Sequence, residues 1–217
     1  MKPDFALPNG AQVFEVLEQG TDEWLQVRAG LATASRFDVL LVKGKGENGL
    51  GAGAITYARE VAGELIAGTP EETFSNPYME RGKRLEDQIR TDYEFMTDSE
   101  VQEVGFITRN GVGYSPDGLV GLDGLVEFKN HKREKVIAMI LAEEFPKEHF
   151  AQCLGGLYVT GRDWIDLCAY SEGLPHFVRR LERADCEKEL AQLEEAIQRF
   201  NGFVSDVVER VRAYGNQ

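Results

Sequence analysis

The sequence lacks any apolar run long enough to cross a bilayer, and its N-terminus has no basic, apolar and small-residue leader. These absences favour a cytoplasmic protein. Its three cysteines, an odd number without Cys-x-x-Cys spacing, indicate reduced thiols rather than a disulfide framework or a zinc site. Neither internal repeats nor low-complexity segments divide the 217 residues, so we expect a single domain over residues 1–217 with one good-sized core.

Basic residues are also scarce, and the net charge is −13. A protein that coats nucleic acid usually carries a basic surface, so this class is disfavoured. The acids concentrate in residues 71–103 and from residue 182 onward, whereas bases gather in two local clusters: Arg28, Arg36, Lys43 and Lys45, and Lys129, Lys132, Arg133 and Lys135. This distribution fits an enzyme that encloses DNA in a locally basic channel.

The most informative segment joins two carboxylates through a short turn. Ser115-Pro116-Asp117-Gly118-Leu119 is followed by Glu127-Phe128-Lys129, and Leu122-Asp123-Gly124 between them is typical of a hairpin turn. Two short strands joined there bring Asp117 beside Glu127. Because side chains alternate along a strand, Glu127 and Lys129 share one face while Phe128 points into the core.

Two carboxylates and an ammonium at this spacing can hold Mg²⁺ against a phosphodiester. The cation can turn bound water into a nucleophile, and the lysine can help to deprotonate that water or stabilise charge on phosphorus. This is the PD-(D/E)XK nuclease signature. The alternative is a surface hairpin with a solvated Glu–Lys pair, because short motifs of this kind recur by chance.

The chain pattern predicts an α/β fold with a mixed sheet of about five strands flanked by helices. Strands are expected near 101–107, on both sides of the hairpin, and at 164–170 and 176–181. Helices are expected at 22–29, 33–42, 54–67, 77–97, 132–142 and 148–160, with a core over about 20–181. Residues 43–53, rich in glycine, are expected to form a loop.

A long C-terminal helix is expected at about 184–213. Its apolar residues recur at alternating steps of three and four: Leu190, Leu193, Ile197, Phe200, Val204, Val207 and Val211. This stripe predicts a helix docked on its own domain, with a coiled-coil seam as the alternative.

Several blocks, in order, resemble the phage lambda exonuclease family of viral recombination nucleases. They are Trp24-Leu25-Gln26-Val27-Arg28-Ala29-Gly30, Thr33-Ala34-Ser35, Arg81-Gly82-Lys83 with Glu86 and Arg90 to Tyr93, the two acidic motifs above, and Ala151-Gln152 through Tyr158-Val159-Thr160-Gly161. The resemblance covers residues 20–170. It implies a restriction-endonuclease-like core and a Mg²⁺-dependent exonuclease that degrades one strand of duplex DNA from its 5′ end.

The resemblance also implies partners and cofactors. Family members form a ring-shaped homotrimer around DNA and leave 3′ overhangs for a single-strand annealing protein, which places the chain in the cytoplasm of a bacterial host. Two Mg²⁺ ions per site are expected, with Mn²⁺ able to substitute. The alternatives are a restriction-like or repair endonuclease of the same class, and a catalytically inactive protein that binds DNA ends.

By this resemblance, Asp117, Glu127 and the Phe128 backbone carbonyl are the metal ligands, and Lys129 contacts the attacking water or a phosphate oxygen. Glu86 faces the metals from the central helix; a surface Glu86–Arg90 pair is the alternative. Gln152 orients water or phosphate, unless it is an ordinary surface glutamine.

A second group is expected to bind the 5′-phosphate. Ser35 lies in the first turn of the 33–42 helix, where free N–H groups favour an anion, and Arg28 and Ser115 complete the pocket. The alternative is a buried arginine that holds helix ends together. Lys43 and Lys45 are candidate contacts to the duplex backbone, or solvated lysines, and Met79 is a candidate strand-parting wedge, or core packing.

One segment departs from the family pattern. Asn130-His131 follows Lys129 where the family often has Cys-Pro. His131 is therefore interpreted as a solvated or DNA-facing residue rather than a catalytic one, and His149 and His176 carry no signal.

Overall fold

A computed structural model describes residues 7–46, 48–71 and 77–215, without the side chains of residues 77–85. Among the helices of this described part, none is both long and apolar enough to cross a membrane. Cys153, Cys168 and Cys186 are buried and unbridged, as the cysteine spacing predicted.

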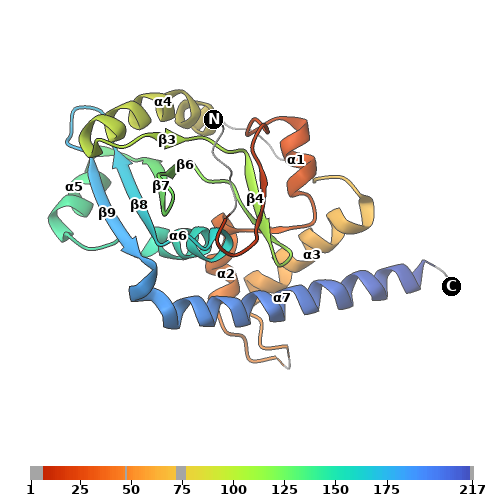
Figure 1. Cartoon of the computed structure of the whole chain (residues 1–217). Helices are drawn as coiled ribbons and strands as arrows, with labels where there is room; N and C mark the ends of the chain where they lie inside the picture. The colour runs from red at the N-terminus through yellow and green to blue at the C-terminus, as the bar shows by residue number, and fades with distance from the viewer. Residues whose placement is uncertain (1–6, 47, 72–76, 216–217) are drawn as a thin grey trace.

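The larger sheet has five strands in the order β3-β6-β7-β8-β9 (Figure 1). These strands are β3 (Val101–Gln102), β6 (Gly118–Val120), β7 (Gly124–Asn130), β8 (Trp164–Tyr170) and β9 (Phe177–Glu182). Only β7 and β8 pair in parallel, and the connection between them runs through α5 (Arg133–Ala142) and α6 (Lys147–Thr160). The expected five-stranded mixed sheet with flanking helices is confirmed.

A second, four-stranded sheet was not predicted. Its order is β1-β4-β5-β2, formed by β1 (Gln12–Phe14), β4 (Phe106–Arg109), β5 (Val112–Tyr114) and β2 (Ala32–Thr33). The single strand expected at 101–107 is wrong, because β3 pairs with β6 and β4 pairs with β1 and β5. The break falls at Gly105, whose N–H donates to the Phe14 carbonyl and whose own carbonyl accepts from the Trp24 indole.

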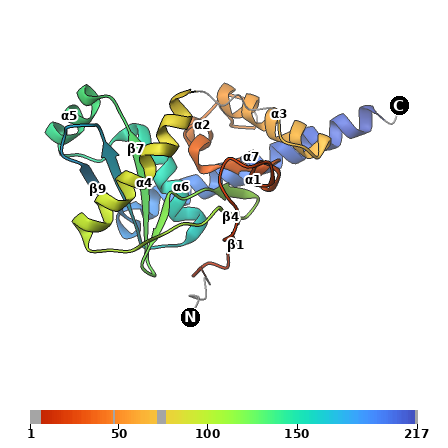
Figure 2. The ribbon, with the colours of Figure 1, turned by 90° about the horizontal axis from the view of Figure 1, so that it is seen from above.

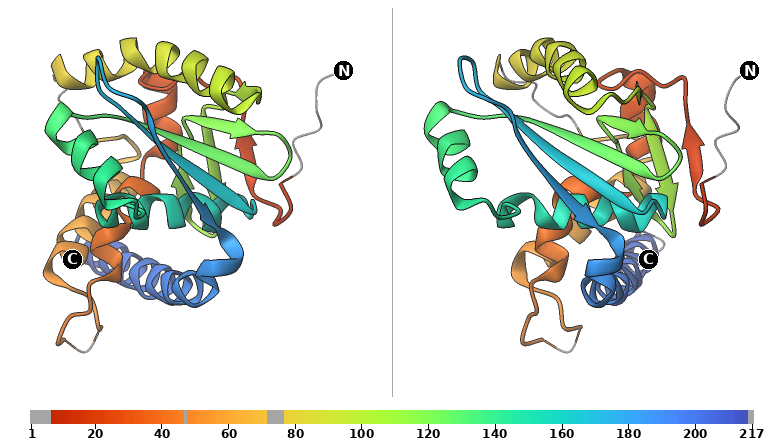
Figure 3. Two further views of the ribbon diagram at one scale, coloured as in Figure 1. Left: turned by 90° about the vertical axis from the view of Figure 1, so that its left-hand side faces the viewer. Right: turned by 60° about the vertical axis from the view of Figure 1, so that its left-hand side comes forward.

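Two helices cover opposite faces of the five-stranded sheet (Figure 3). On one face lies α4 (Pro77–Thr97), whose Ile89 and Tyr93 pack with Val126 and Phe128 of β7. On the other lies α6, and beyond it runs α7 (Glu187–Tyr214). The apolar residues of β7 therefore divide between two hydrophobic clusters, with Leu125 in the main core and Val126 and Phe128 against α4, which fixes the side to which each residue of the strand points.

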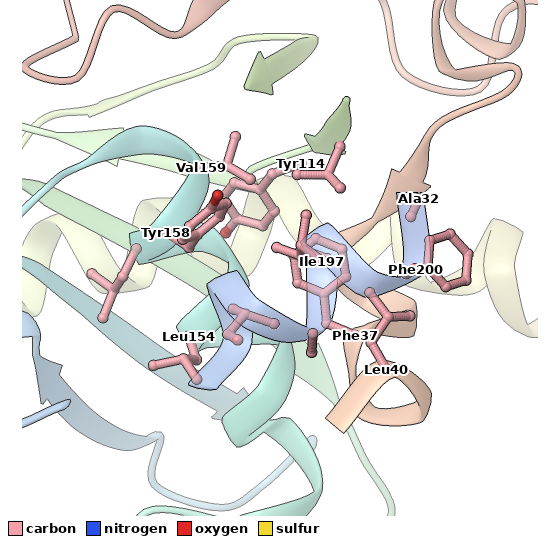
Figure 4. Packing of buried hydrophobic residues seen from close by; sticks show 14 of the residues in the cluster. Ala32, Phe37, Leu40, Tyr114, Leu154, Tyr158, Val159, Ile197 and Phe200 are labelled. Carbon is pink, nitrogen blue, oxygen red and sulfur yellow. The ribbon is translucent and has the colours of Figure 1, made fainter. Parts of the chain in front are cut away.

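The main core lies where α2 (Phe37–Leu41), α6 and α7 meet (Figure 4). Phe37, Leu154, Ile197 and Phe200 are fully or almost fully buried there. Gly155 permits the contact, because a Cβ at that position would lie 2.7 Å from the Phe37 ring. The predicted C-terminal helix is thus docked on its own chain, and its large exposed apolar side chains, Val211 and Tyr214, lie in its last turns.

The remaining helices agree with expectation except in one segment. Thr21 caps α1 (Asp22–Arg28) by accepting from the Trp24 N–H, and α3 spans Ala52–Ala67 (Figure 2). The single helix expected at 33–42 is wrong. The chain instead forms β2, a 3-10 turn η1 (Ala34–Arg36) and the five-residue α2, because Thr33 pairs with β5. A second 3-10 turn, η2 (Arg183–Cys186), precedes α7.

Candidate active site

Strand β7 presents its two charged residues to the α6 side of the sheet. Glu127 and Lys129 lie on that face, and the lysine Nζ donates to Glu127 Oε1 at 2.5 Å. Phe128 points the other way and contacts the Tyr93 ring edge-on, with centroids 5.9 Å apart. The alternation predicted for this strand is therefore observed.

The β6–β7 hairpin places Asp117 against the same strand. Gly118 pairs with Val126, and Asp117 Oδ2 accepts from the Phe128 N–H at 2.7 Å. The turn of this hairpin is fastened by Arg162, which donates to the backbone carbonyls of Gly121 at 3.0 Å and Gly124 at 2.6 Å. Because Arg162 is almost fully buried, these charge-assisted hydrogen bonds fix the hairpin that carries both carboxylates.

Glu127 is almost fully buried and has partners on both oxygens. Oε1 accepts from Lys129 and from the Gln152 amide on α6, and Oε2 accepts from the Tyr114 hydroxyl at 2.8 Å. Gln152 is therefore not an ordinary surface glutamine, since it contacts the buried carboxylate directly. Tyr114 ends β5, so this hydrogen bond joins the two sheets.

The site has more negative charge than its own bases balance. Burial and the nearby Glu127 raise the pKa of Asp117 well above its ordinary value, and burial also raises the pKa of Glu86. Although burial alone would lower it, the pKa of Lys129 is raised by Glu127 and Asp117. Beside these two carboxylates Lys129 is therefore a charged ammonium, and its Nζ donates a hydrogen bond to Glu127.

Glu86 approaches this cluster from α4. Its charge interacts with Glu127 and Lys129, and it also lies 3.8 Å from Arg90, as the surface-pair alternative required. Arg90 is shared with two further carboxylates, Asp87 at 3.2 Å and Glu103. Arg90 therefore only partly neutralises Glu86.

The donor set of the cluster suits a hard divalent cation. Carboxylate oxygens are the ligands that Mg²⁺ prefers, and three buried or half-buried carboxylates face one ammonium. At present the Lys129 ammonium lies against Glu127 Oε1, where a cation would bind. Asp117, Glu127 and the Phe128 carbonyl could hold such an ion, with Glu86 nearby.

Comparison with known proteins places the chain. Residues 23–163 match the YqaJ-like viral recombinase domain family. The chain belongs to this family. An alkaline exonuclease, LHK-Exo from Laribacter hongkongensis, is 32% identical over 90% of this chain and 98% of its own, with a TM-score of 0.78. The structure of LHK-Exo in complex with dAMP gives a TM-score of 0.79. The predicted resemblance to recombination nucleases is confirmed.

A more distant structure supports the fold of this YqaJ-like chain. A phage-related exonuclease from Haemophilus somnus 129PT is 13% identical, covers 83% of this chain and 96% of its own, and has a TM-score of 0.66. The search of curated proteins gave no match. The range matched by the family contains all the candidate site residues and ends before α7.

The expected phosphate pocket is partly assembled in this YqaJ-like chain. Arg28 donates to the Ser115 hydroxyl at 2.9 Å and stacks 3.9 Å above the Trp24 ring, and burial lowers its pKa. Thr33 pairs in parallel with Gly113, and Ser35 and Ser115 each follow this pair by two residues on their own segments. The Thr33 and Ser35 hydroxyls are 3.3 Å apart. Ser35 lies in a three-residue 3-10 turn, however, so the argument from a long helix dipole does not apply.

The remaining candidates lie apart from the carboxylates. Lys43 and Lys45 are exposed in the loop before α3, and Lys43 lies beside the first half of α7; among the described residues no contact joins either lysine to the cluster. Met79 lies in α4, but its side chain is outside the described residues.

Sequence reasoning missed two contributors near the site. Tyr114 belongs to an unpredicted strand in the other sheet, so no local pattern linked it to Glu127. His131, interpreted from the sequence as a solvated or DNA-facing residue, and His149, which carried no signal, lie with their Nε2 atoms 2.9 Å apart. Their separation of 18 residues spans α5, and only the β7–α6 packing reveals the pair.

Proposed function

We propose that this chain is a divalent-metal-dependent nuclease that digests one strand of linear duplex DNA from the 5′ end. Its product is a duplex with 3′ single-stranded overhangs for recombination by strand annealing. The observation that carries the proposal is the buried cluster of Asp117, Glu127 and Lys129, with its excess of negative charge, in a chain of the YqaJ-like family.

The chemistry divides among the residues of the cluster. Asp117, Glu127 and the Phe128 carbonyl would bind one or two Mg²⁺ ions, with Glu86 beside them. The bound cation supplies a water of lowered pKa and Lewis-acid stabilisation of the phosphodiester. Lys129, held as an ammonium, donates hydrogen bonds to the developing charge on phosphorus. Gln152 and Tyr114 fix the orientation of Glu127 through its two oxygens.

The polarity of the reaction rests on Arg28 and Ser115. A guanidinium and a hydroxyl, bonded at 2.9 Å, offer donors to a terminal phosphate. Ser115 lies two residues before Asp117, so this pocket and the carboxylates are held close together by the chain itself. LHK-Exo, whose structure includes a dAMP complex, supports a nucleotide-binding role for the fold.

Larger-scale features belong to the same proposal. Residues 1–217 would form one nuclease domain, three copies would form a ring around DNA, and an annealing protein would bind the exposed strand. Mn²⁺ would substitute for Mg²⁺. Light scattering of the free protein tests the trimer: a monomer at the concentrations used for digestion would contradict it.

Digestion of linear duplex DNA, labelled separately at the 5′ and 3′ ends, tests the reaction. With Mg²⁺, the 5′ label is released first, and covalently closed circles remain intact. Cutting of closed circles would instead identify an endonuclease. Binding to DNA ends with Mg²⁺ but without nucleotide release would identify an inactive end-binding protein.

Two matched substitutions locate the chemistry. Glu127→Gln keeps the shape of the side chain but removes its charge, and we expect the rate to fall by at least about 10³-fold. Glu134→Gln, at an exposed position of α5, is the control and leaves the rate unchanged. Similar rates for both variants would place the active site elsewhere.

A further inference from the structure

Three potential metal ligands gather beside the candidate active site but are not part of it. His131 follows β7, and Glu148 and His149 lie in the first turn of α6. One donor atom from each lies within 4.8 Å of the others, and within the described residues no other group of three or more His, Cys, Asp or Glu side chains meets this criterion. The expected nuclease chemistry assigns these residues no role.

The spacing of the donor atoms is close to that of a shared coordination sphere. His131 Nε2 and His149 Nε2 are 2.9 Å apart, and His149 Nε2 is 3.5 Å from Glu148 Oε1. Ligands about 2.1 Å from a tetrahedral ion lie roughly 3.4 Å from one another. The two rings are inclined by 23°, and binding of one ion requires them to rotate until both nitrogens point at it.

The two imidazoles are also in the right protonation state. Burial lowers the pKa of His131, and burial with the nearby Lys129 ammonium lowers the pKa of His149 to about 4. At neutral pH both rings are therefore uncharged, and each has a nitrogen lone pair to offer. One proton now joins the two Nε2 atoms, and a metal ion would replace it.

We propose that His131, His149 and Glu148 form a second metal site, which binds one divalent ion of the zinc class. Two imidazoles and a carboxylate match the ligand preference of Zn²⁺ or Co²⁺, whereas Mg²⁺ prefers the all-oxygen cluster around Asp117. Three protein ligands leave a fourth position open to water or to an anion.

A lysine now pairs with the carboxylate of the proposed site. The Lys135 ammonium lies 2.9 Å from Glu148 Oε1 and lowers the pKa of that carboxylate. Its side chain is 38% exposed, so it can turn into solvent when an ion binds. Because the ammonium repels a cation and competes for Glu148, removal of Lys135 strengthens ion binding.

Occupancy of the site would tie together two elements that meet at the carboxylate cluster. His131 is two residues beyond Lys129, and His149 is one helical turn before Gln152. The ion would therefore fasten the end of β7 to the start of α6. Binding and thermal stabilisation by the ion are independent of the proposed nuclease reaction, and they persist even if the chain cuts no DNA.

The test is a Zn²⁺ titration of the full chain against a chromophoric chelator, with Mg²⁺ in excess to saturate the carboxylate cluster. We expect one tightly bound Zn²⁺ per chain, and at least about a hundredfold weaker binding for His149→Ala and His131→Ala. His176→Ala is the matched control, because His176 lies against Asp92 away from the cluster, and it leaves binding unchanged. Wild-type binding equal to that of both cluster variants would overturn the proposal.

Two milder variants guard against a folding defect in the histidine variants. Glu148→Gln, at an exposed position, weakens Zn²⁺ binding, whereas Lys135→Met tightens it. Co²⁺ adds a spectroscopic readout, since a tetrahedral site with nitrogen ligands gives a visible absorption band that His131→Ala abolishes. Weaker binding by Lys135→Met, or a Co²⁺ band that survives His131→Ala, would refute the assignment.

Discussion

The two faces of the five-stranded sheet each bury a carboxylate, and the two are treated differently. Asp166 on β8 points to the α4 face, and Glu127 on β7 points to the α6 face; they are 2% and 1% exposed. Asp166 receives a two-pronged contact from Arg180, at 2.8 and 2.9 Å, and a hydrogen bond from Tyr93 at 2.7 Å. Its charge is matched one to one.

The α6 face has no such balance. There Glu127 and Asp117, with Glu86 nearby, share the single ammonium of Lys129, and the pKa of Asp117 is raised accordingly. A buried carboxylate with a matched arginine holds strands and helix together, whereas a surplus of buried carboxylates either retains a proton, as the raised pKa of Asp117 favours, or binds a cation from outside the chain. The comparison separates a buried carboxylate whose charge is matched from buried carboxylates whose charge is not, without reference to any motif.

Arg180→Met should remove the charge that pairs with Asp166 on the α4 face, and we expect it to give the largest loss of stability. The substitution leaves Asp166 buried with only the Tyr93 hydroxyl, and it removes a guanidinium stacked 3.4 Å from the Trp164 ring. We expect a loss of about 3 kcal/mol in the free energy of unfolding, or roughly 6–12 °C in Tm, measured by denaturant and thermal melts.

The control for this loss is an exposed ion pair. Arg36 and Glu60 are 3.3 Å apart with side chains 45% and 38% exposed, so Arg36→Met should change stability by less than about 1 kcal/mol. Equal effects of the two methionine substitutions would mean that Asp166 does not depend on Arg180.

Arg28 presents the opposite imbalance, a half-buried cation without a carboxylate within 4.0 Å among the described residues. If that charge serves a phosphate, Arg28→Ala slows digestion of 5′-phosphorylated ends by about tenfold more than that of 5′-hydroxyl ends. The measurement is initial rates on the two substrates under the same conditions. Equal slowing on both would show that Arg28 only holds α1 to β5.

The smallest predicted effect is a gain in stability when one of the buried carboxylates, Asp117, is neutralised. Asp117→Asn removes one carboxylate from the group that outnumbers the Lys129 ammonium, but it keeps an oxygen that can accept a hydrogen bond from the Phe128 N–H. In the presence of a chelator we expect the variant to be about 1 kcal/mol more stable than wild type, a rise of roughly 2–4 °C in Tm. Added Mg²⁺ should stabilise wild type and not the variant.

Asp166→Asn is the matched comparison, since the same chemical change at the balanced face leaves Arg180 without its partner. Asp166→Asn should lower Tm by the same amount in chelator and in added Mg²⁺. If both substitutions shift Tm in the same direction in chelator, the distinction between the two faces is wrong.

The sequence predicted those features that depend on local pattern. The alternation of Glu127, Phe128 and Lys129, the turn at Leu122-Asp123-Gly124 and the cap at Thr21 each act within a few residues, and each is observed. The family blocks supplied Gln152, whose contact with Glu127 crosses 25 residues and has no local signal.

The misses share a cause, which is long-range pairing. Thr33 joined β2 rather than a helix because Gly113 was available as a strand partner, and residues 101–109 divided between two sheets because their partners lie in different places. Tyr114 and the His131–His149 pair follow from the same packing. A one-dimensional pattern contains no record of such partners.

The short connection between Ser115 and Asp117 limits the distance between two groups that we expect to contact DNA. Only Pro116 separates the hydroxyl that meets Arg28 from the carboxylate that meets Phe128, and two residues of extended backbone span no more than about 7 Å. The distance between these two groups is limited by the covalent backbone itself, so a ligand that contacts both must match a nearly fixed spacing. One inserted residue would therefore lengthen the distance that separates the Ser115 hydroxyl from the Asp117 carboxylate.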